Sequence, residues 1–507
     1  MTDVLTQSEY EGIAASLTLP TGAFINGSAR RAASGRTFES LNPATGDTLS
    51  QLALCEAADV DLAVEKARDA FNSGSWAHQH PADRKATLIK LVKLIKRHQH
   101  ELAVLESLES GKPIYDIETV DLPETLHCLE WHAEAADKIY DQVAPAGNDA
   151  VAMIVREPLG VVGAVLPWNF PLLMLAWKMA PALAAGNSLI VKPAEETSMT
   201  ALRVAELAIE AGLPRGVFNV ITGPGEITGQ LLGLHHDVDM VSFTGSTEIG
   251  RRFLEYSAQS NLKKIVLECG GKNPCVVMDD VENLDMAAQH ATNAAFWNMG
   301  ENCSANSRLV AHKEIATKLV THIENHLKQW PLGNPLDPVN RLGAIVSKQQ
   351  HARIMGYIEQ AKSEGATLVT GGESIEVANG FFIAPTIFTG VTPSMTLAKE
   401  EVFGPVLAVI EIASEEEAIN VANDTCYGLA ASVFTASVRR AHRMAKAIRA
   451  GTVTVNTYGE GDISTPFGGF KQSGFGGRDN SLHAHDQFTE LKTIWIDLAD
   501  SSQDALD

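Results

Sequence analysis

Cysteine is scarce in this chain, and its spacing argues against two kinds of site. The 507 residues include six cysteines, at positions 55, 128, 269, 275, 303 and 426, and no C-x-x-C pair. A disulfide framework or a cysteine zinc site would need closely paired cysteines, so we predict neither. Histidine pairs such as His98 and His100 also lack further ligands at the spacing of a metal site. We therefore expect no bound metal, and we expect most of the cysteines to be small buried apolar residues.

Basic residues and a long hydrophobic run are also lacking. The chain has 40 Lys and Arg against 62 Asp and Glu, a formal net charge of −22 at pH 7. Nucleic-acid binding needs clustered Lys and Arg, so no such partner is expected. The most apolar helical stretch, residues 171–186, contains Lys178 and is too short to span a membrane. Because the N-terminus also lacks the pattern of a secretion signal, we expect a cytoplasmic protein without a membrane partner.

The sequence does contain a long alternation of short β-branched runs and segments with helical periodicity. A chain of this length favours two or three structural units. In the first half, the alternation predicts βαβ units around a parallel sheet, with strands at 161–166, 188–191, 217–221 and 240–243 and helices at 172–185 and 200–211. A further strand at 264–271 ends in a double-glycine turn that we expect to connect two units.

The second half repeats the alternation and predicts another α/β unit. Its helices are predicted at 313–330, 348–364, 414–423 and 437–450, and its strands at 366–370, 405–412, 429–434 and 452–456. Before residue 150, amphipathic periodicity predicts helices at 61–72 and 85–108. The segments 150–156 and 489–498 predict strands outside both units, and exposed strands often pair with another subunit.

Two glycine-flanked segments carry candidate catalytic groups. LECGGK at 267–272 contains the carboxylate of Glu268, and GENCSANSR at 300–308 contains the thiol of Cys303. A thiol can attack an electrophilic carbon and form a covalent intermediate, and a nearby carboxylate can deprotonate the water that releases the product. The pair therefore indicates two-step covalent catalysis.

Three further segments favour a nucleotide site. Lys192 and Glu195 follow a strand at the edge where open α/β sheets bind ligands, although the alternative is a solvated surface pair. FTGSTEIG at 243–250 follows a strand and opens a helix whose free N–H groups suit a pyrophosphate, with an ordinary N-cap by Ser246 as the alternative. A glycine cluster at 223–229 follows another strand, where a nucleotide could meet bare backbone.

The candidate segments belong to a larger ordered set of motifs, with PWNFPL at 167–172, EEVFGPV at 400–406 and PFGGFKQSG at 466–474. From about residue 24 to residue 498, the set resembles the NAD(P)-dependent aldehyde dehydrogenase superfamily. The resemblance implies an aldehyde dehydrogenase-like α/β fold with two Rossmann-like α/β domains and a small β oligomerisation arm, assembled as a homodimer or homotetramer. The implied boundaries are 20–138 and 160–268 for the NAD-binding domain, 269–478 for the catalytic domain, 139–159 and 479–498 for the arm, and 1–19 and 499–507 for terminal segments.

The resemblance also assigns roles to single residues. It implies that Cys303 is the nucleophile, Glu268 the general base and Asn169 the donor to an oxyanion. Lys178 and Asp479 match positions that carry a proton outward, although relatives often have Glu at the second position and a surface ion pair is the alternative. Glu195 favours NAD over NADP, because its carboxylate would repel a 2′-phosphate; NADP is the alternative cofactor. The residues that match cofactor-binding positions are Pro167, Trp168, Lys192, Glu195, Gly225, Gly229, Phe243, Gly245, Ser246, Glu401 and Phe403.

A closer similarity concerns the substrate. The segments 133–145, 460–462 and 481–495 resemble bacterial dehydrogenases of γ-glutamyl-γ-aminobutyraldehyde and guanidinobutyraldehyde, enzymes of polyamine and arginine breakdown. This implies NAD-dependent oxidation of an ω-amino or related aldehyde to a carboxylic acid. The alternatives are a general aliphatic or aromatic aldehyde dehydrogenase and, in another class, a non-redox cysteine thioesterase or hydrolase.

Two sets of side chains are candidates for contact with such a substrate. Acidic residues at a tunnel mouth would stabilise a cation, and aromatic residues would form an apolar tunnel wall. Plain solvent exposure and ordinary core packing are the respective alternatives. The candidates are Asp121, Glu124, Glu460 and Asp462 for the mouth, and Phe170, Trp177, Trp297 and Phe467 for the wall.

Overall fold

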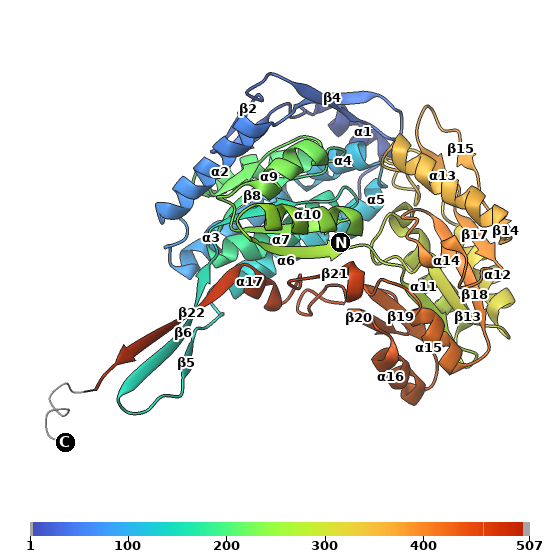
Figure 1. Cartoon of the computed structure of the whole chain (residues 1–507). Helices are drawn as coiled ribbons and strands as arrows, with labels where there is room; N and C mark the ends of the chain where they lie inside the picture. The colour runs from blue at the N-terminus through green and yellow to red at the C-terminus, as the bar shows by residue number, and fades with distance from the viewer. Residues whose placement is uncertain (1–3, 460, 500–507) are drawn as a thin grey trace.

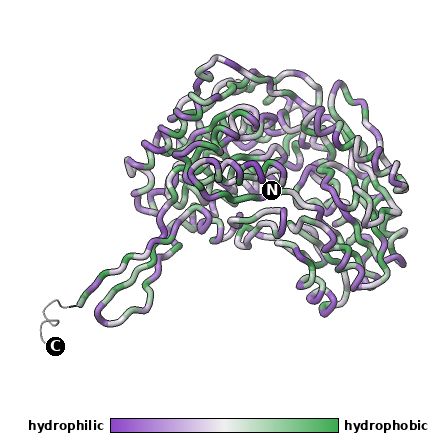
Figure 2. Tube along the Cα trace, viewed as in Figure 1, coloured by the Kyte–Doolittle hydropathy of each residue, from purple (hydrophilic) through white to green (hydrophobic). Residues whose placement is uncertain are grey.

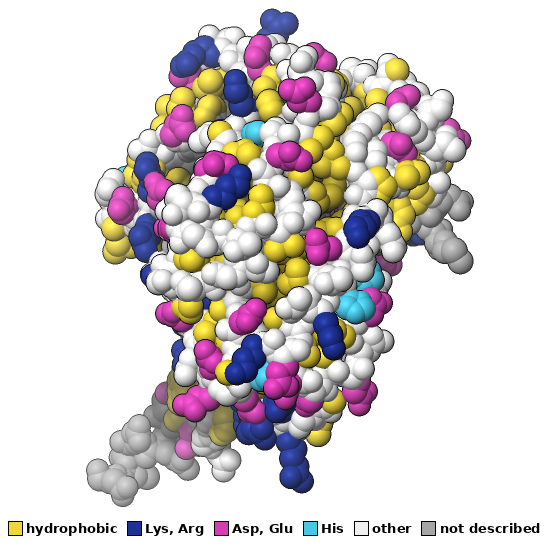
Figure 3. Space-filling view, turned by 90° about the vertical axis from the view of Figure 1, so that its right-hand side faces the viewer, with side chains coloured by type: hydrophobic (Ala, Val, Ile, Leu, Met, Phe, Trp, Pro, Cys, Tyr) yellow, Lys and Arg dark blue, Asp and Glu magenta, His cyan; other side chains and the backbone are white. Residues whose placement is uncertain are grey.

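The computed structural model describes residues 4–459 and 461–499, which form two α/β units and a projecting β arm (Figure 1). The two units lie side by side, and each is a sheet packed between helices. Figure 3 shows acidic side chains scattered over one face of the molecule, among basic and hydrophobic ones, as expected for a net charge of −22.

The first unit is built on an eight-stranded sheet in the order β2-β1-β9-β8-β7-β10-β11-β21. Its central strands pair in parallel, and they are β7 (Val161–Val165), β8 (Ser188–Lys192), β9 (Phe218–Val220), β10 (Met240–Gly245) and β11 (Lys264–Cys269). Antiparallel strands extend its edges, and they are β1 (Ala23–Ile25), β2 (Ser28–Arg30) and β21 (Gly474–Phe475). Four of its helices are α7 (Pro171–Ala185), α8 (Met199–Ala211), α9 (Gln230–Leu234) and α10 (Thr247–Gln259). The strands and helices predicted for this unit are confirmed.

Both faces of this sheet are covered, because alternate residues of its central strands enter two different cores. In β7, Val162 and Ala164 pack in one core, whereas Val161 and Val165 pack in the other. This double burial explains why the strands read as continuous apolar runs. α7 is buried along nearly its whole length, so its apolar run is core packing. Within the described ranges, no helix combines the length and apolar character needed to cross a bilayer.

The second unit repeats the design on a seven-stranded sheet in the order β14-β17-β18-β13-β12-β19-β20. Its strands are β12 (Pro274–Val277), β13 (Arg308–His312), β14 (Thr367–Thr370), β17 (Thr386–Thr389), β18 (Val406–Ile412), β19 (Ala430–Phe434) and β20 (Thr452–Val455). Its longer helices are α11 (Leu284–Phe296), α12 (Ala316–Leu327), α13 (Lys348–Ser363), α15 (Glu415–Asn423) and α16 (Val438–Ala447). The elements predicted for the second half are confirmed, and so is the α/β fold class.

A three-stranded sheet projects from the first unit as the arm (Figure 1). Its strands are β5 (Gln142–Ala144), β6 (Ala150–Pro158) and β22 (Thr489–Asp497), with β6 and β22 antiparallel along their whole length. Apolar side chains on the arm are exposed, including Val143 at 75% and Trp495 at 65%, and Figure 2 shows hydrophobic residues along it. Pairing of the arm with another subunit stays a prediction.

Several features differ from the sequence prediction. The predicted helix 85–108 is two helices, α3 (Pro81–Arg97) and α4 (Gln99–Ser110), because the backbone leaves the helical conformation at His98. Strand β21 joins the first sheet, although its residues fall in the range predicted for the catalytic domain. The predicted helix 61–72 is confirmed as α2, which begins four residues earlier (Ala57–Asn72). Elements that were not predicted include α1 (Gln7–Ser16), α6 (Leu122–Ala135), α11, and the hairpin of β3 (Thr37–Leu41) and β4 (Thr48–Ala53).

Candidate active site

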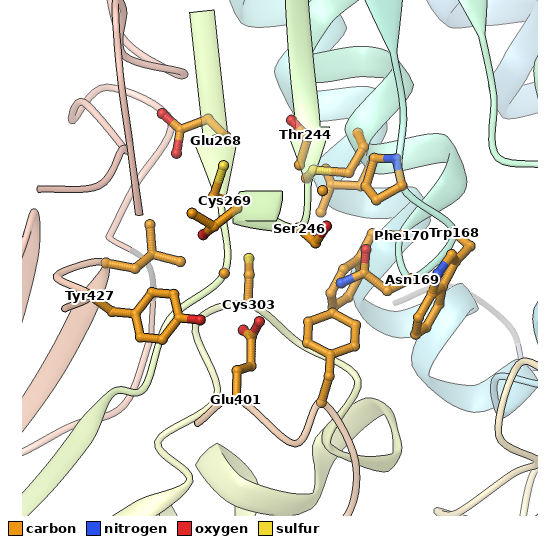
Figure 4. A pocket seen from close by; sticks show the side chains of 18 of the residues that line it. Trp168, Asn169, Phe170, Thr244, Ser246, Glu268, Cys269, Cys303, Glu401 and Tyr427 are labelled. Carbon is orange, nitrogen blue, oxygen red and sulfur yellow. The ribbon is translucent and has the colours of Figure 1, made fainter. Parts of the chain in front are cut away.

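A cavity of about 370 Å³ lies between the two units and brings the predicted catalytic trio together (Figure 4). The first unit contributes the segment 167–170 and the ends of β10 and β11. The second unit contributes the loop around residues 401–403 and a turn before β13. Asn169, Glu268 and Cys303 all line this cavity, so its chemistry depends on both units.

Cys303 lies in a tight turn between the short helix η3 (Trp297–Gly300) and β13. The backbone is left-handed at residues 298–300, with φ of 52°, 55° and 67°. A side chain at Gly300 would meet a facing backbone carbonyl oxygen at 2.3 Å, so glycine is required there. The Asn273 side chain donates to the Cys303 carbonyl oxygen over 2.7 Å and holds the turn. The turn thus presents a half-buried thiol to the cavity.

Asn169 is tied to the same turn by two side-chain amides. Its own Nδ2 donates to the carbonyl oxygen of Glu301 at 3.0 Å, and Asn298 Nδ2 donates to the carbonyl oxygen of Asn169 at 3.0 Å. A side-chain amide has two N–H donors, and the bond to Glu301 engages one of them. The Asn169 amide is therefore fixed beside the turn that carries Cys303, with another N–H to offer to the cavity.

Glu268 lies at the end of β11 with its carboxyl group buried in the cavity wall. It is 4% exposed, and neither oxygen has a hydrogen-bond partner among the described residues. Burial raises the pKa of Glu268 well above its usual value, and the charge of Asp479 adds to the rise, whereas Lys178 and Arg478 oppose it. A carboxyl group with a raised pKa and uncommitted oxygens is suited to take a proton from a bound molecule.

Lys178 and Asp479 form a buried ion pair next to this carboxyl group. Lys178 Nζ donates to Asp479 Oδ2 at 2.6 Å, and the two side chains are 0% and 1% exposed. Gln487, in the short helix α17 (His483–Gln487), donates to the other Asp479 oxygen at 3.1 Å. The alternative of a surface ion pair is therefore wrong. Asp479 also lines the cavity, which places the pair where it can exchange a proton with the site.

Six of the residues predicted to bind a cofactor line the same cavity, and they are Pro167, Trp168, Gly245, Ser246, Glu401 and Phe403. The Trp168 and Phe403 rings meet edge to face with centroids 5.2 Å apart. Glu401 accepts from the Gly271 N–H at 2.8 Å, and burial raises its pKa to about 7. Ser246 Oγ accepts from the N–H of residue 249 at 3.3 Å, so the N-cap is formed by this side chain. The cap leaves the remaining N–H groups of the α10 start available to an anion.

The other predicted cofactor residues lie away from the cavity lining. Lys192 Nζ donates to Glu195 Oε2 at 3.0 Å at the end of β8. Lys192 is buried and the Glu195 side chain is 37% exposed, so the pair is only partly solvated. A side chain at Gly225 would lie 4.0 Å from Lys192 Nζ, so the glycine cluster lies next to the Lys192–Glu195 pair. Phe243, by contrast, is a core residue whose ring packs on Phe253, and Gly229 faces the same Phe253 ring. The structure does not bring these two to the cavity.

The four predicted wall residues do line the cavity, as two pairs of aromatic rings. Phe170 and Trp297 have centroids 5.2 Å apart, and Trp177 and Phe467 have centroids 5.1 Å apart. Leu173 and Met174 line it too and were missed. Their spacing from Phe170 and Trp177 on α7 is that of one helix face, a signal that could have identified them.

The predicted acidic mouth is wrong for Asp121, and for the other candidates it stays a prediction. Asp121 is completely buried and bonded to Lys112, which removes its charge from any tunnel opening. Glu124 and Asp462 are exposed but do not line the cavity, and Asp462 accepts from Ser464 in its own loop. Glu460 lies outside the described residues. In the ranges 4–459 and 461–499, no cluster of His, Cys, Asp and Glu is arranged to hold a metal ion.

Comparison with known proteins gives a consistent result. Residues 30–494 match the aldehyde dehydrogenase family. The chain is 59% identical to aminoacetaldehyde dehydrogenase of Pseudomonas aeruginosa over 98% of this chain and 100% of that protein. Its structure matches the γ-glutamyl-γ-aminobutyraldehyde dehydrogenase of Burkholderia cenocepacia J2315 with a TM-score of 0.96 and 50% identity, covering 98% and 100% of the two chains. An indole-3-acetaldehyde dehydrogenase solved with NAD+ matches with a TM-score of 0.96 and 48% identity, covering 97% and 100%.

Proposed function

Because the chain belongs to the aldehyde dehydrogenase family, we propose that it oxidises ω-amino aldehydes to carboxylic acids with NAD, using Cys303, Glu268 and Asn169. The observation that carries the proposal is the convergence of these three side chains on one cavity between the two units. Oxidation of an aldehyde with NAD(P) is the reaction of the family; the residue roles, the preference for NAD and the substrate class are the proposal.

The chain's own residues fit a dinucleotide along the edge of the first sheet. The Lys192–Glu195 pair suits a ribose, and the start of α10 suits a pyrophosphate. Burial tends to raise the pKa of Glu195, but the charge of Lys192 holds that pKa below its usual value. The carboxylate is therefore ionised, and it would repel the 2′-phosphate of NADP. Glu401 and Phe403 would hold the nicotinamide half beside Cys303. A nicotinamide bound there supplies the hydride acceptor.

In the first step, the Cys303 thiolate adds to the aldehyde carbon and the carbonyl oxygen takes up negative charge. The Asn169 side-chain N–H and the Cys303 backbone N–H are the donors that stabilise this oxyanion. Loss of one such donor typically costs about 3 to 4 kcal/mol of transition-state stabilisation. The bond from Asn169 to the Glu301 carbonyl keeps the amide in place before the substrate arrives. Loss of hydride from the adduct leaves a thioester on Cys303.

In the second step, Glu268 takes a proton from the water that attacks this thioester. Its buried oxygens have no partner among the described residues, so they are available to a water molecule in the cavity. The Lys178–Asp479 pair lies behind the carboxyl group and passes the proton outward. Gln487 donates to the other oxygen of Asp479 and fixes the orientation of this side chain, which is shorter than the Glu that relatives often have at this position.

Turnover should rise with pH in the range of the raised Glu268 pKa. Only the deprotonated carboxylate can accept a proton, and a raised pKa keeps Glu268 protonated at pH values where an ordinary carboxyl group is ionised. Steady-state rates measured across pH, under conditions where thioester hydrolysis limits kcat, should show this rise. A Glu268→Gln variant should lose it, and an unchanged profile in that variant would contradict the assignment.

An ω-amino aldehyde fits the cavity through its aromatic walls. The rings of Phe170, Trp297, Trp177 and Phe467 surround the approach to Cys303, and an ammonium group is attracted to aromatic faces by roughly 0.5 to 2 kcal/mol. The high identity to an aminoacetaldehyde dehydrogenase supports the same class. The same rings would also pack an indole, as in the similar indole-3-acetaldehyde dehydrogenase, so an aromatic aldehyde is the second candidate.

A matched substrate panel tests the proposal. 4-Aminobutyraldehyde and pentanal have similar length, but only the first carries an ammonium group. We expect kcat/KM to favour the amino aldehyde by at least about 5-fold, the effect of about 1 kcal/mol of cation–π attraction. Indole-3-acetaldehyde tests the second candidate, and each aldehyde is measured with NAD and with NADP.

A Trp177→Leu variant serves as the control, because it keeps an apolar wall while removing a ring. The preference for the amino aldehyde should shrink in this variant. A clear preference of the wild type for pentanal would refute the amino-aldehyde proposal. Oxidation without any need for NAD or NADP would favour a non-redox cysteine hydrolase.

A further inference from the structure

Three charged side chains are buried behind the segment that carries Asn169 and Phe170. Glu106 on α4, Lys112 after it and Asp121 at the end of the π-helical turn η1 (Ile117–Asp121) are each 0% exposed. Burying three ionisable groups is costly unless each is bonded. Their contacts therefore identify what the cluster supports.

The cluster contacts the segment 169–172 at two points. Glu106 Oε2 accepts from the Leu172 N–H at 3.0 Å, at the start of α7 and directly after Phe170 and Pro171. Lys112 Nζ lies 3.7 Å from the centroid of the Phe170 ring, a cation–π contact in a dry environment. The Phe170 ring also contacts Trp297, in the turn that leads to Cys303.

A proton shared between Glu106 and Asp121 would give a hydrogen-bond partner to the carboxyl oxygens of the cluster that lack one. Lys112 donates to Asp121 Oδ2, while Glu106 Oε1 and Asp121 Oδ1 are buried and have no hydrogen-bond partner when both acids are ionised. Burial, and next the charge of Asp121, raise the pKa of Glu106 to about 8. A protonated Glu106 donates to Asp121 and still accepts from the Leu172 N–H, so every group is satisfied.

We propose that Glu106 and Lys112 are positioning residues that hold Asn169 and Phe170 in register with the Cys303 turn. Glu106 anchors the backbone just after the oxyanion donor, and Lys112 sets the Phe170 ring that forms one cavity wall. This inference rests on the role of Asn169 in the proposed function. It does not depend on which aldehyde is preferred, so it is tested with whichever aldehyde the wild type oxidises best.

Two variants of Glu106 separate positioning from mere stability. Glu106→Gln can accept from Leu172 and donate to Asp121, and we expect kcat within about 2-fold of the wild type. Glu106→Leu can do neither, and we expect kcat to fall about 10- to 100-fold for every aldehyde tested, with KM for NAD unchanged. Alkylation of Cys303 by iodoacetamide should keep its rate in both variants, because the nucleophile turn itself is intact.

Lys112→Met keeps the length of the side chain and removes its charge. We expect KM for aldehydes to rise about 5- to 10-fold, because the Phe170 wall loses its support, with a smaller change in kcat. This variant keeps the proposal testable if Glu106→Leu does not fold. Glu130→Gln, an exposed carboxylate change on α6, is the matched control and should leave both constants unchanged.

The kinetic pattern decides the outcome. Folded Glu106→Leu with a lowered Tm but the kcat of the wild type would overturn the proposal, and so would Lys112→Met with unchanged KM. Equal losses in Glu106→Gln and Glu106→Leu would overturn the shared-proton arrangement. Failure of the amino-aldehyde panel alone would leave these expectations intact, so the two proposals fail separately.

Discussion

Replacing Cys303 by alanine should abolish aldehyde oxidation while cofactor binding persists. The thiol is the proposed point of covalent attachment, and no other side chain of the catalytic trio can form a thioester. Loss of a nucleophile of this kind typically lowers kcat by about 10⁴-fold or more. NADH formation measured by absorbance gives the rate, and NAD binding measured by fluorescence or calorimetry gives the control for folding.

Two other cysteines provide matched controls for this loss. Cys269 lines the same cavity beside Glu268, but burial raises the pKa of its thiol to about 12, so it is not a thiolate at neutral pH. Cys426 is exposed and does not line the cavity. Cys269→Ala and Cys426→Ala should both retain turnover. If Cys269→Ala were inactive and Cys303→Ala active, the nucleophile would have been assigned to the wrong cavity thiol.

Replacing Glu268 by glutamine should stop the enzyme after a single round of hydride transfer. Glutamine has nearly the same shape but cannot take a proton from water, so the thioester should form and persist. General-base catalysis is worth about 10²- to 10⁴-fold, which sets the expected fall in steady-state rate. Rapid mixing should show a burst of one NADH per active site, and mass spectrometry should detect the acylated Cys303.

The step at which the reaction stops distinguishes Glu268→Gln from variants of two other carboxylates. Glu255→Gln changes an exposed carboxylate on α10 that does not line the cavity, and it should leave steady-state turnover unchanged. Asp479→Asn should keep the burst and slow the steady state, because it weakens the proton exit through Lys178. A Glu268→Gln variant without any burst would mean that the carboxylate is needed before the thioester forms.

Sequence periodicity was sufficient to predict the five central parallel strands of the first sheet and four strands of the second sheet. It missed the strands β1, β2, β12, β13, β17 and β21. The parallel strands are buried on both faces, which leaves continuous apolar runs such as 161–165 that stand out in the sequence. Helix α11 was missed because most of its buried residues are alanines, whose stripe is weak in hydrophobicity. The break at His98 was missed because Ile95 and Leu102, on either side of the polar run 96–101, are seven residues apart, a spacing that also fits one continuous helix.

The site was predictable to the extent that it depends on motifs. Residues in short ordered segments, such as Asn169, Glu268 and Cys303, were identified as candidates before any geometry, and the structure brings them into one cavity. Asp121 shows the limit of such reasoning. An isolated Asp reads as an exposed charge, and only the fold reveals Lys112 beside it in a dry interior. Glu106 had no motif at all, because its importance lies in a contact with distant Leu172.

Strand β21 has a consequence for how the protein is made. It pairs with β11 so that Gly474 lies opposite Glu268, while Phe467 and Asp479 close the same cavity. A ribosome delivers Glu268 and Cys303 long before these late residues emerge, and such long-range pairing is slow to form. A chain that ends before residue 467 therefore lacks part of the cavity wall, and we expect it to be inactive although it already contains Glu268 and Cys303.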